Sequence, residues 1–256
     1  MRAILSLPGD WSAPAWPRRL ALAVSAALFV GLGCSHKQPA ASTPPAPVIP
    51  GETAPAAPAP IPSLSADEQF VDTHAPVYTE TGVASWYGPP YHNRVGANGL
   101  VYDQNGVSAA HRTLPMGSLI RVTNVKTGQS AVMRVTDRGP FVAGRILDLS
   151  IGAAKAVGLW RAGTGEVRID VFSTPKPMDE GGRWCVQIGA FLHQGSALHL
   201  QSALEREYRS ANVIEFQGPT GYWVRIRPEN DDRTVATRIA STLQPAEGQA
   251  WLVRLD

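Results

Sequence analysis

The sequence predicts two folded modules, a mainly β module that forms a small barrel and a smaller α+β module that follows it. Three observations support this prediction. The length of 256 residues suits two domains of about 100 residues each. Short strand-like runs separated by glycine, proline and asparagine begin at Thr81. A pattern of strands and helices in the order βαββαβ begins at Arg183.

The N-terminus has the features of an export signal. Arg18 and Arg19 precede an apolar run over residues 20–32, which fits the n-region and h-region of a signal peptide and is short for a membrane span. The run ends at Gly-Leu-Gly before Cys34, which resembles a bacterial lipobox, although leucine is usual where Gly31 stands. We therefore expect residues 1–33 to be removed and Cys34 to be lipidated. The alternative is an ordinary secretory peptide with a chance cysteine.

Residues 34–80 are expected to be a lipidated N-terminus followed by a spacer. Nine prolines fall within residues 39–62, together with many alanines and almost no charge. Such a stretch cannot build a core, and its prolines favour extended, semi-rigid polyproline II geometry. The spacer would hold the folded modules away from a membrane. A disordered tail with no selected length is the alternative.

Composition excludes several classes of function. The net charge of +2 gives no dense basic stripe, so a nucleic-acid partner is not expected. Cys185 is expected to be a buried apolar residue and not a disulfide partner of Cys34. The six histidines show no compact metal-ligand spacing, and neither cysteine joins one, so no metal and no cofactor are predicted.

The first module, residues 81–174, consists of short strands and one helix. Strand-length runs separated by turn signals lie at residues 107–110, 118–123, 131–136, 146–149 and 167–172. Ser150 is a suitable cap for a short helix over residues 151–157, and Gly158 is a suitable end. A polar segment with proline and glycine, residues 175–182, is expected to link this module to the next.

The second module, residues 183–256, shows two helical stripes and several half-buried strands. The stripes consist of Ala197, Leu200, Leu204 and Tyr208, and of Val235, Ile239 and Leu243. Alternating apolar positions at residues 222–226 and 251–255 are typical of strands with one buried face. With the opening strand at residues 183–191, the order is βαββαβ.

Motifs in both modules resemble known cell-wall families. ASWYG at residues 84–88, followed in order by ANG, AAHRTLP, VTN, TDRGPF and DLS, resembles the rare lipoprotein A family over residues 81–172. That resemblance implies a six-stranded double-psi β-barrel that cleaves the glycan strands of peptidoglycan. RWCVQIGAF at residues 183–191 resembles the opening strand of a SPOR domain, whose family binds septal peptidoglycan that lacks stem peptides.

The resemblance places the catalytic chemistry on Asp137 and His111. A lytic transglycosylase protonates the glycosidic oxygen and takes the proton from the 6-hydroxyl of the muramoyl ring, and one carboxyl group can do both. Such a carboxyl group needs a site that keeps it protonated, through burial or a negative neighbour. Asp137 stands at a strand end and aligns with the family's aspartate, and His111 aligns with its histidine. The alternative is that Asp137 organises the turn before Gly139 and that His111 is structural.

One position departs from the family pattern. The family usually has glutamate after ANG, where this chain has Leu100, and leucine cannot transfer a proton. Either Asp137 suffices alone, with Asp103 as a substitute if the loop bends it inward, or the barrel binds glycan without cleaving it.

Further residues are expected to contact the saccharide. The aromatic planes of Trp86 and Tyr87 can stack on sugar rings, with core packing as the alternative for Trp86. The motifs ANG and TDRGPF assign Asn98 and Arg138 to substrate binding. In the second module the expected glycan-binding residues, on an exposed sheet face, are Gln187, Trp223 and Arg225.

Together these expectations describe a lipoprotein of the bacterial envelope. It would cleave peptidoglycan endolytically, act on strands without stem peptides, leave 1,6-anhydro ends and be directed to the division septum. Ser35 after the lipidated cysteine favours anchoring in the outer membrane, facing the periplasm. Denuded glycan strands, the membrane and divisome proteins are the expected partners. The alternatives are an inactive septal glycan-binding lipoprotein, with Leu100 as the reason, and a purely structural tether.

Overall fold

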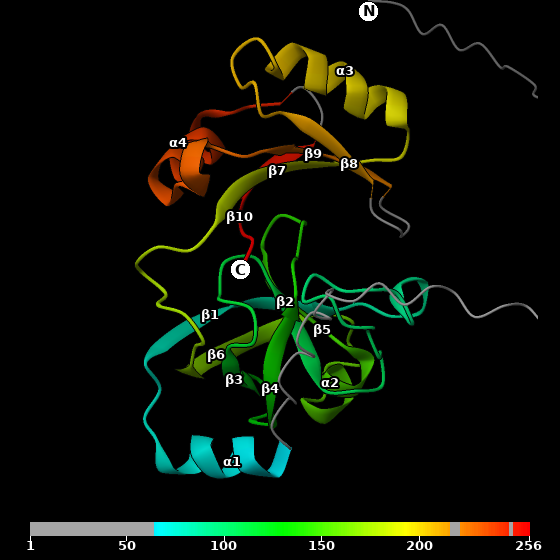
Figure 1. Ribbon diagram of the computed structural model, residues 1–256. Helices are drawn as coiled ribbons and strands as arrows, with labels where there is room; N and C mark the ends of the chain where they lie inside the picture. The colour runs from blue at the N-terminus through cyan, green and yellow to red at the C-terminus, as the bar shows by residue number, and fades with distance from the viewer. Residues whose placement is uncertain (1–63, 216–220, 246–247) are drawn as a thin grey trace, which may run out of the picture. The chain divides into compact units, whose positions relative to one another are not determined.

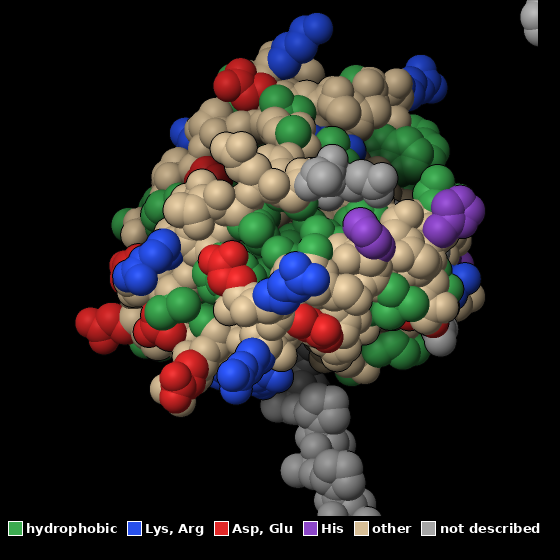
Figure 2. All heavy atoms as spheres, turned by 90° about the horizontal axis from the view of Figure 1, so that it is seen from above, with side chains coloured by type: hydrophobic (Ala, Val, Ile, Leu, Met, Phe, Trp, Pro, Cys, Tyr) green, Lys and Arg blue, Asp and Glu red, His purple; other side chains and the backbone are tan. Residues whose placement is uncertain are grey.

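The computed structural model describes residues 64–215, 221–245 and 248–256. The expected signal peptide, the lipidation site at Cys34 and the proline-rich stretch lie outside these residues. No helix in the described part of the chain is both long and apolar enough to cross a membrane. On the face seen in Figure 2, basic and acidic side chains are interspersed, as the small net charge of +2 would suggest.

The first module is a closed barrel of six strands in the order β1-β5-β2-β4-β3-β6 (Figure 1). The strands are β1 (Tyr78–Trp86), β2 (Ser108–His111), β3 (Leu119–Asn124), β4 (Ser130–Asp137), β5 (Arg145–Leu149) and β6 (Gly165–Ser173). The pairs β1/β5 and β2/β4 are parallel, and the other four pairs are antiparallel. Closure leaves no strand edge unpaired, which removes the usual site of edge-to-edge association. The predicted six-stranded barrel is confirmed.

The barrel interior is filled by apolar side chains that alternate along the strands. Ala84, Ala109, Val135, Leu147 and Leu149 all belong to the buried core cluster. Because successive side chains of a strand point to opposite faces, the residues next to them face away from this core. Asp148, between the core residues Leu147 and Leu149, lies on that outer face. Asp137 comes two residues after the core residue Val135, and a register shift between β2 and β4 places it opposite Ala110 on the same outer face.

The helix α2 (Ile151–Ala156) follows β5 as predicted. The Ser150 hydroxyl accepts a hydrogen bond from the backbone N–H of Ala153 at 3.1 Å and donates one to the carbonyl of Gly106 at 2.6 Å. The first bond satisfies an N–H at the start of the helix. The second fixes the loop before β2 against the end of β5. Gly158, just after the helix, has a φ of +72°, which suits a glycine.

The helix α1 (Leu64–Thr73) lies within the segment expected to be a spacer. Val71 packs with Leu119, Val132 and Phe172 on the outside of the barrel. Asp67 receives two hydrogen bonds from the Arg134 guanidinium, at 2.6 and 2.9 Å. The expectation of a spacer up to residue 80 therefore does not hold for these residues, because one apolar side chain and a bidentate ion pair attach the helix to the barrel.

The second module is a four-stranded antiparallel sheet in the order β10-β7-β9-β8 with two helices (Figure 1). Its elements are β7 (Trp184–Phe191), α3 (Gln194–Leu204), β8 (Asn212–Glu215), β9 (Tyr222–Ile226), α4 (Arg233–Thr242) and β10 (Gln249–Arg254). Ala197 and Leu204 of α3 and Ala236 and Ile239 of α4 share one buried cluster with the sheet. The predicted βαββαβ order is confirmed.

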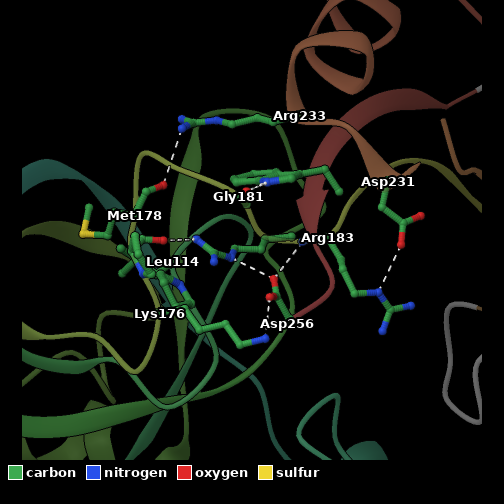
Figure 3. Close-up of polar contacts among 12 residues, drawn as sticks. Leu114, Lys176, Met178, Gly181, Arg183, Asp231, Arg233 and Asp256 are labelled. Carbon is green, nitrogen blue, oxygen red and sulfur yellow. Dashed lines mark hydrogen bonds and ion pairs between the residues drawn. The ribbon is translucent and has the colours of Figure 1, made fainter. Parts of the chain in front are cut away.

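Residues 176–181 are bound to the ends of β7 and β10 through Asp256 and Arg254. Figure 3 shows Lys176 and Arg183 beside Asp256. The Asp256 carboxylate accepts bonds from Lys176 Nζ at 2.7 Å, Arg183 N at 3.0 Å and Arg254 Nε at 2.9 Å. Arg254 also donates to the carbonyl of Pro177 at 2.8 Å. Partial burial favours the protonated acid, but these donors outweigh it and lower the pKa of Asp256. The segment expected to be a linker is thus bound to the second module through the side chains of Arg254 and Asp256.

Candidate active site

A row of four outward-facing residues crosses the strands β1, β5, β2 and β4. Ser85 lies opposite Asp148, Asp148 lies opposite Ala110, and Ala110 lies opposite Asp137. Residues directly opposite each other on paired strands share a face. Two carboxylates therefore lie on either side of the small Ala110 side chain, on the face away from the barrel core.

Asp137, the predicted acid, ends β4 with one carboxylate oxygen bound to backbone. Its Oδ1 accepts bonds from the N–H groups of Ala97 at 3.0 Å and Arg138 at 2.8 Å. None of the described residues donates a hydrogen bond to its Oδ2. Burial raises the pKa of Asp137, the two backbone N–H groups and Arg138 oppose this, and the charge of Asp148 adds to the increase. This is the environment that a carboxyl group needs to act first as an acid.

Asp148 is a second carboxylate, for which the sequence analysis gave no role. Its Oδ1 accepts a bond from the Ser85 hydroxyl at 2.5 Å, and Arg145 Nη2 lies 3.4 Å from its Oδ2. Burial raises the pKa of Asp148 despite the Ser85 bond and the charges of Arg145 and Arg112. Asp137 and Asp148 line the same cavity. The alternation in ILDLS, in which Asp148 stands between two core leucines, was the signal that could have identified it.

His111 is held by two backbone N–H groups and by Glu80. Its Nδ1 accepts bonds from the N–H groups of Thr113 at 3.2 Å and Leu114 at 3.0 Å. The hydrogen of the neutral ring is therefore on Nε2, which lies 3.3 Å from Glu80 Oε2. The side chain is buried, and burial lowers the pKa of His111 more than Glu80 raises it. In this structure a neutral His111 connects β2 to β1 and does not contact Asp137.

Stacked tyrosines and the loop before β2 form part of the cavity wall. The rings of Tyr87 and Tyr102 stack at 4.5 Å, and the Tyr102 hydroxyl donates to the Tyr87 carbonyl at 2.9 Å. Both tyrosines line the cavity beside Asp137. Trp86 instead packs against the barrel core, with its ring 4.3 Å from Trp160. Of the two expected stacking residues, only Tyr87 is in position to face a ligand.

The loop that carries Asn98 and Leu100 lies against Asp137. A Cβ at Gly96 would lie 3.7 Å from Asp137 Cγ, and Asn98 Oδ1 accepts a bond from Leu100 N at 3.0 Å. Asn98, Leu100 and Asp137 line a second, smaller cavity. The residue that replaces the family's glutamate is therefore located near the acid. Asp103 accepts a bond from Asn105 N at 2.9 Å, so it organises its own turn.

Arg138 has mainly backbone partners. Its Nη1 donates to the carbonyls of His111 at 3.0 Å and Leu114 at 2.7 Å, and its Nη2 donates to that of Asp256 at 2.8 Å. Burial lowers the pKa of Arg138 to about 10. The Arg138 side chain lines the cavity. Its guanidinium N–H groups, which were expected to bind the substrate, instead donate hydrogen bonds to these three backbone oxygens.

The three residues expected to bind glycan in the second module meet on neighbouring strands. Gln187 and Arg225 are register partners, and Arg225 Nη2 donates to Gln187 Oε1 at 3.0 Å. Gln187 and Trp223 are only 1% and 2% exposed, so the expectation of an exposed pair is wrong for both. Trp223 packs with Cys185, Trp251 and Val253, and the ring of Phe141 lies 4.7 Å from it. Arg225 remains partly exposed.

Comparison with known families agrees with both modules. A family model described as lytic transglycolase matches residues 79–169, and a SPOR domain model matches residues 180–254. The first module is thus a double-psi barrel of the lytic transglycolase class, and the second is a SPOR domain. A probable endolytic peptidoglycan transglycosylase RlpA from Synechocystis is 54% identical over 90 residues, which cover 35% of this chain and 28% of that protein.

Two further relatives extend the match. The endolytic peptidoglycan transglycosylase RlpA of Vibrio cholerae is 51% identical over 100 residues, 39% of this chain and 38% of that protein. The Campylobacter jejuni protein of the same name is 37% identical over 156 residues, 52% of this chain and 56% of that protein. The chain thus matches less than two thirds of the length of each relative. It belongs to the rare lipoprotein A (RlpA) family.

Proposed function

We propose that this chain is an endolytic lytic transglycosylase that cleaves the glycan strands of peptidoglycan. The observation that carries the proposal is Asp137, a partly buried acid with a raised pKa, whose Oδ2 receives no hydrogen bond from the described residues. The aromatic wall formed by Tyr87 and Tyr102 suits the apolar faces of sugar rings. The names of the relatives support the same activity.

The chemistry needs one carboxyl group that acts twice. Protonated Asp137 gives its proton to the glycosidic oxygen while the bond from that oxygen to C1 of the muramoyl residue breaks. The Asp137 carboxylate then accepts the proton of the 6-hydroxyl as its oxygen bonds to C1, closing the 1,6-anhydro ring. No water is consumed, and Asp137 ends the cycle protonated as it began.

The SPOR domain supports denuded septal strands as the substrate. We extend the proposal to anchoring through a lipid on Cys34 and to enrichment at the septum through residues 183–256. Deletion of residues 183–256 should abolish septal localisation of a fluorescent fusion. Unchanged localisation would contradict the targeting role.

The second candidate function is glycan binding without cleavage. Leu100 favours it, because it lines a cavity with Asp137 where the family pattern has a carboxylate. Mass spectrometry of products from denuded sacculi separates the two functions, using a soluble protein of residues 35–256 and its Asp137→Asn variant. Anhydro-terminated saccharides from the unsubstituted protein alone support cleavage. Retention on sacculi without products, while a positive-control enzyme cuts them, supports binding only.

A further inference from the structure

Asp148 is a buried carboxylate in the cavity that the proposed mechanism leaves without a role. Its side chain is 15% exposed, and its charge acts on the same site as Asp137. An isolated buried charge is unfavourable unless it has partners, and Asp148 has a hydroxyl and two arginines. These partners either stabilise the fold alone or hold the Asp148 carboxylate in place for the reaction.

Strand register places the two carboxylates at opposite sides of one site. Both are register partners of Ala110 on β2, which lies between β5 and β4. Neighbouring strands are about 4.8 Å apart, and β4 and β5 lie on either side of β2. The Cα atoms of Asp137 and Asp148 are therefore separated by roughly 10 Å. The two side chains share a face and line one cavity, so a sugar ring can lie between them.

Gly139, two residues after Asp137, lies beside both Ala110 and Asp148. A Cβ added at this position would lie 3.8 Å from Asp148 Oδ2 and 3.8 Å from Ala110 Cβ. Its φ of +148° is also a conformation that other residues rarely adopt. The chain after Asp137 thus passes Asp148 and the small Ala110 side chain at Gly139, which has no side chain.

We propose that Asp148 is a second catalytic carboxylate, which contacts the reacting sugar ring and supplies the negative charge that Leu100 lacks. This inference rests on the proposed transglycosylase function. As the glycosidic bond breaks, C1 and the ring oxygen gain positive charge, and an ionised carboxylate beside them stabilises that transition state. The Ser85 hydroxyl and Arg145 hold the Asp148 carboxylate in place and favour its ionised form.

The proposed reaction gives the two carboxylates different tasks. Burial raises the pKa of Asp148, and the Ser85 hydroxyl and the positive charges of Arg145 and Arg112 oppose this by favouring its ionised form. Its negative charge in turn favours the protonated form of Asp137.

The test compares Asp148→Asn with Ser85→Ala on denuded glycan strands. Asp148→Asn keeps the shape and an oxygen acceptor for Ser85 but removes the charge, so we expect cleavage to fall about a hundredfold. Ser85→Ala removes the hydrogen bond but keeps the carboxylate, so we expect a loss of only a few-fold. Equal losses in the two variants, or cleavage by Asp148→Asn at the unsubstituted rate, would overturn the inference.

The acid limb of the pH profile of kcat gives a readout that a structural role would not change. In Asp148→Asn the pKa of Asp137 loses a negative neighbour, so the alkaline limb moves to lower pH. In Ser85→Ala the pKa of Asp148 loses a stabilising donor, so the acid limb moves to higher pH. If Asp148→Asn does not fold, the acid limb of Ser85→Ala decides alone, and an unmoved limb overturns the inference. Adding Leu100→Glu to Asp148→Asn should restore part of the lost activity.

The same experiment separates failure of the inference from failure of the proposed function. If the unsubstituted protein forms no anhydro ends, the transglycosylase proposal itself fails. If it forms them and Asp148→Asn forms them equally fast, only the role of Asp148 fails.

Discussion

The outer face of the barrel and the glycan-binding face expected in the SPOR domain both lie opposite a packed core but have different exposure. In the barrel, Asp137 and Asp148 face away from the core and line a cavity. In the SPOR domain, Gln187 and Trp223 belong to a sheet whose other side packs on the helices, yet both are buried. Alternation places Asp148, Gln187 and Trp223 on their faces, a register shift places Asp137, and packing by distant residues decides whether each face is accessible.

The largest expected effect is at the barrel acid. Asp137→Asn removes the transferable proton, so we expect formation of anhydro ends to fall by about a thousandfold or more, within the range for general acid catalysis. Sacculus binding should be retained. Asp72→Asn on the exposed ion pair of α1 is the matched control and should cleave normally. Comparable cleavage by Asp137→Asn would exclude Asp137 as the acid.

In the SPOR domain the corresponding substitution should affect stability. Trp223→Ala truncates a buried aromatic side chain, so we expect the free energy of unfolding to fall by about 3–5 kcal/mol, measured by urea denaturation. A loss below about 1 kcal/mol, with glycan binding abolished, would show that Trp223 acts as a ligand-binding residue. The SPOR face would then be accessible to glycan, as the barrel cavity is.

Arg225 is the SPOR residue whose substitution should weaken binding. Arg225→Ala removes the partly exposed guanidinium, so we expect the affinity for denuded sacculi to fall about tenfold, the contribution of one charged hydrogen bond. Pull-down with purified sacculi measures this change. Arg209→Ala, at a residue outside the sheet, is the control. Equal binding by Arg225→Ala and the control would contradict a role of this residue in glycan recognition.

The pH dependence of cleavage should reflect the raised pKa of Asp137. The acid must be protonated to act, so the rate should fall as pH rises through this pKa, and the fall should come above the pKa of about 3.9 of a free aspartate. Rates on defined strands at several pH values measure the limb. A rate that falls already near pH 4 would mean that burial does not protect the proton.

The smallest effect is expected for substitution of Leu100, the residue that departs from the family pattern. With Asp148 supplying the negative charge, Leu100→Glu in the otherwise unchanged protein should alter cleavage by less than about threefold. Leu100→Gln is the control for side-chain size. A strong increase with glutamate alone would show that the missing carboxylate limits the reaction.

The sequence predicted local structure better than it predicted contacts. The alternation of apolar residues identified β2 to β6 within one or two residues, and Ser150 correctly marked the start of α2. The helix α1 was missed, because the proline-rich stretch before it dominated the segment. Asp137 was predicted to be the acid from its motif, and this role stays a prediction. The pairing of Ser85 with Asp148, 63 residues apart, depends on strand register, which local patterns do not specify.

The same limit explains His111 and the SPOR face. The contact between Glu80 and His111 joins strands whose pairing follows only from barrel closure. The burial of Trp223 depends on Trp251 and Phe141, which lie far from it in the chain. Motif matching therefore proposed candidate residues without giving their partners.

The most direct test of the account is the origin of the oxygen at the new glycan end. Defined denuded strands are incubated with the protein in water enriched in oxygen-18, and the products are examined by mass spectrometry. If Asp137 catalyses a transglycosylation, we expect 1,6-anhydro ends without the heavy oxygen, and no such ends from Asp137→Asn. Reducing ends that carry oxygen-18, or anhydro ends formed equally by Asp137→Asn, would contradict it.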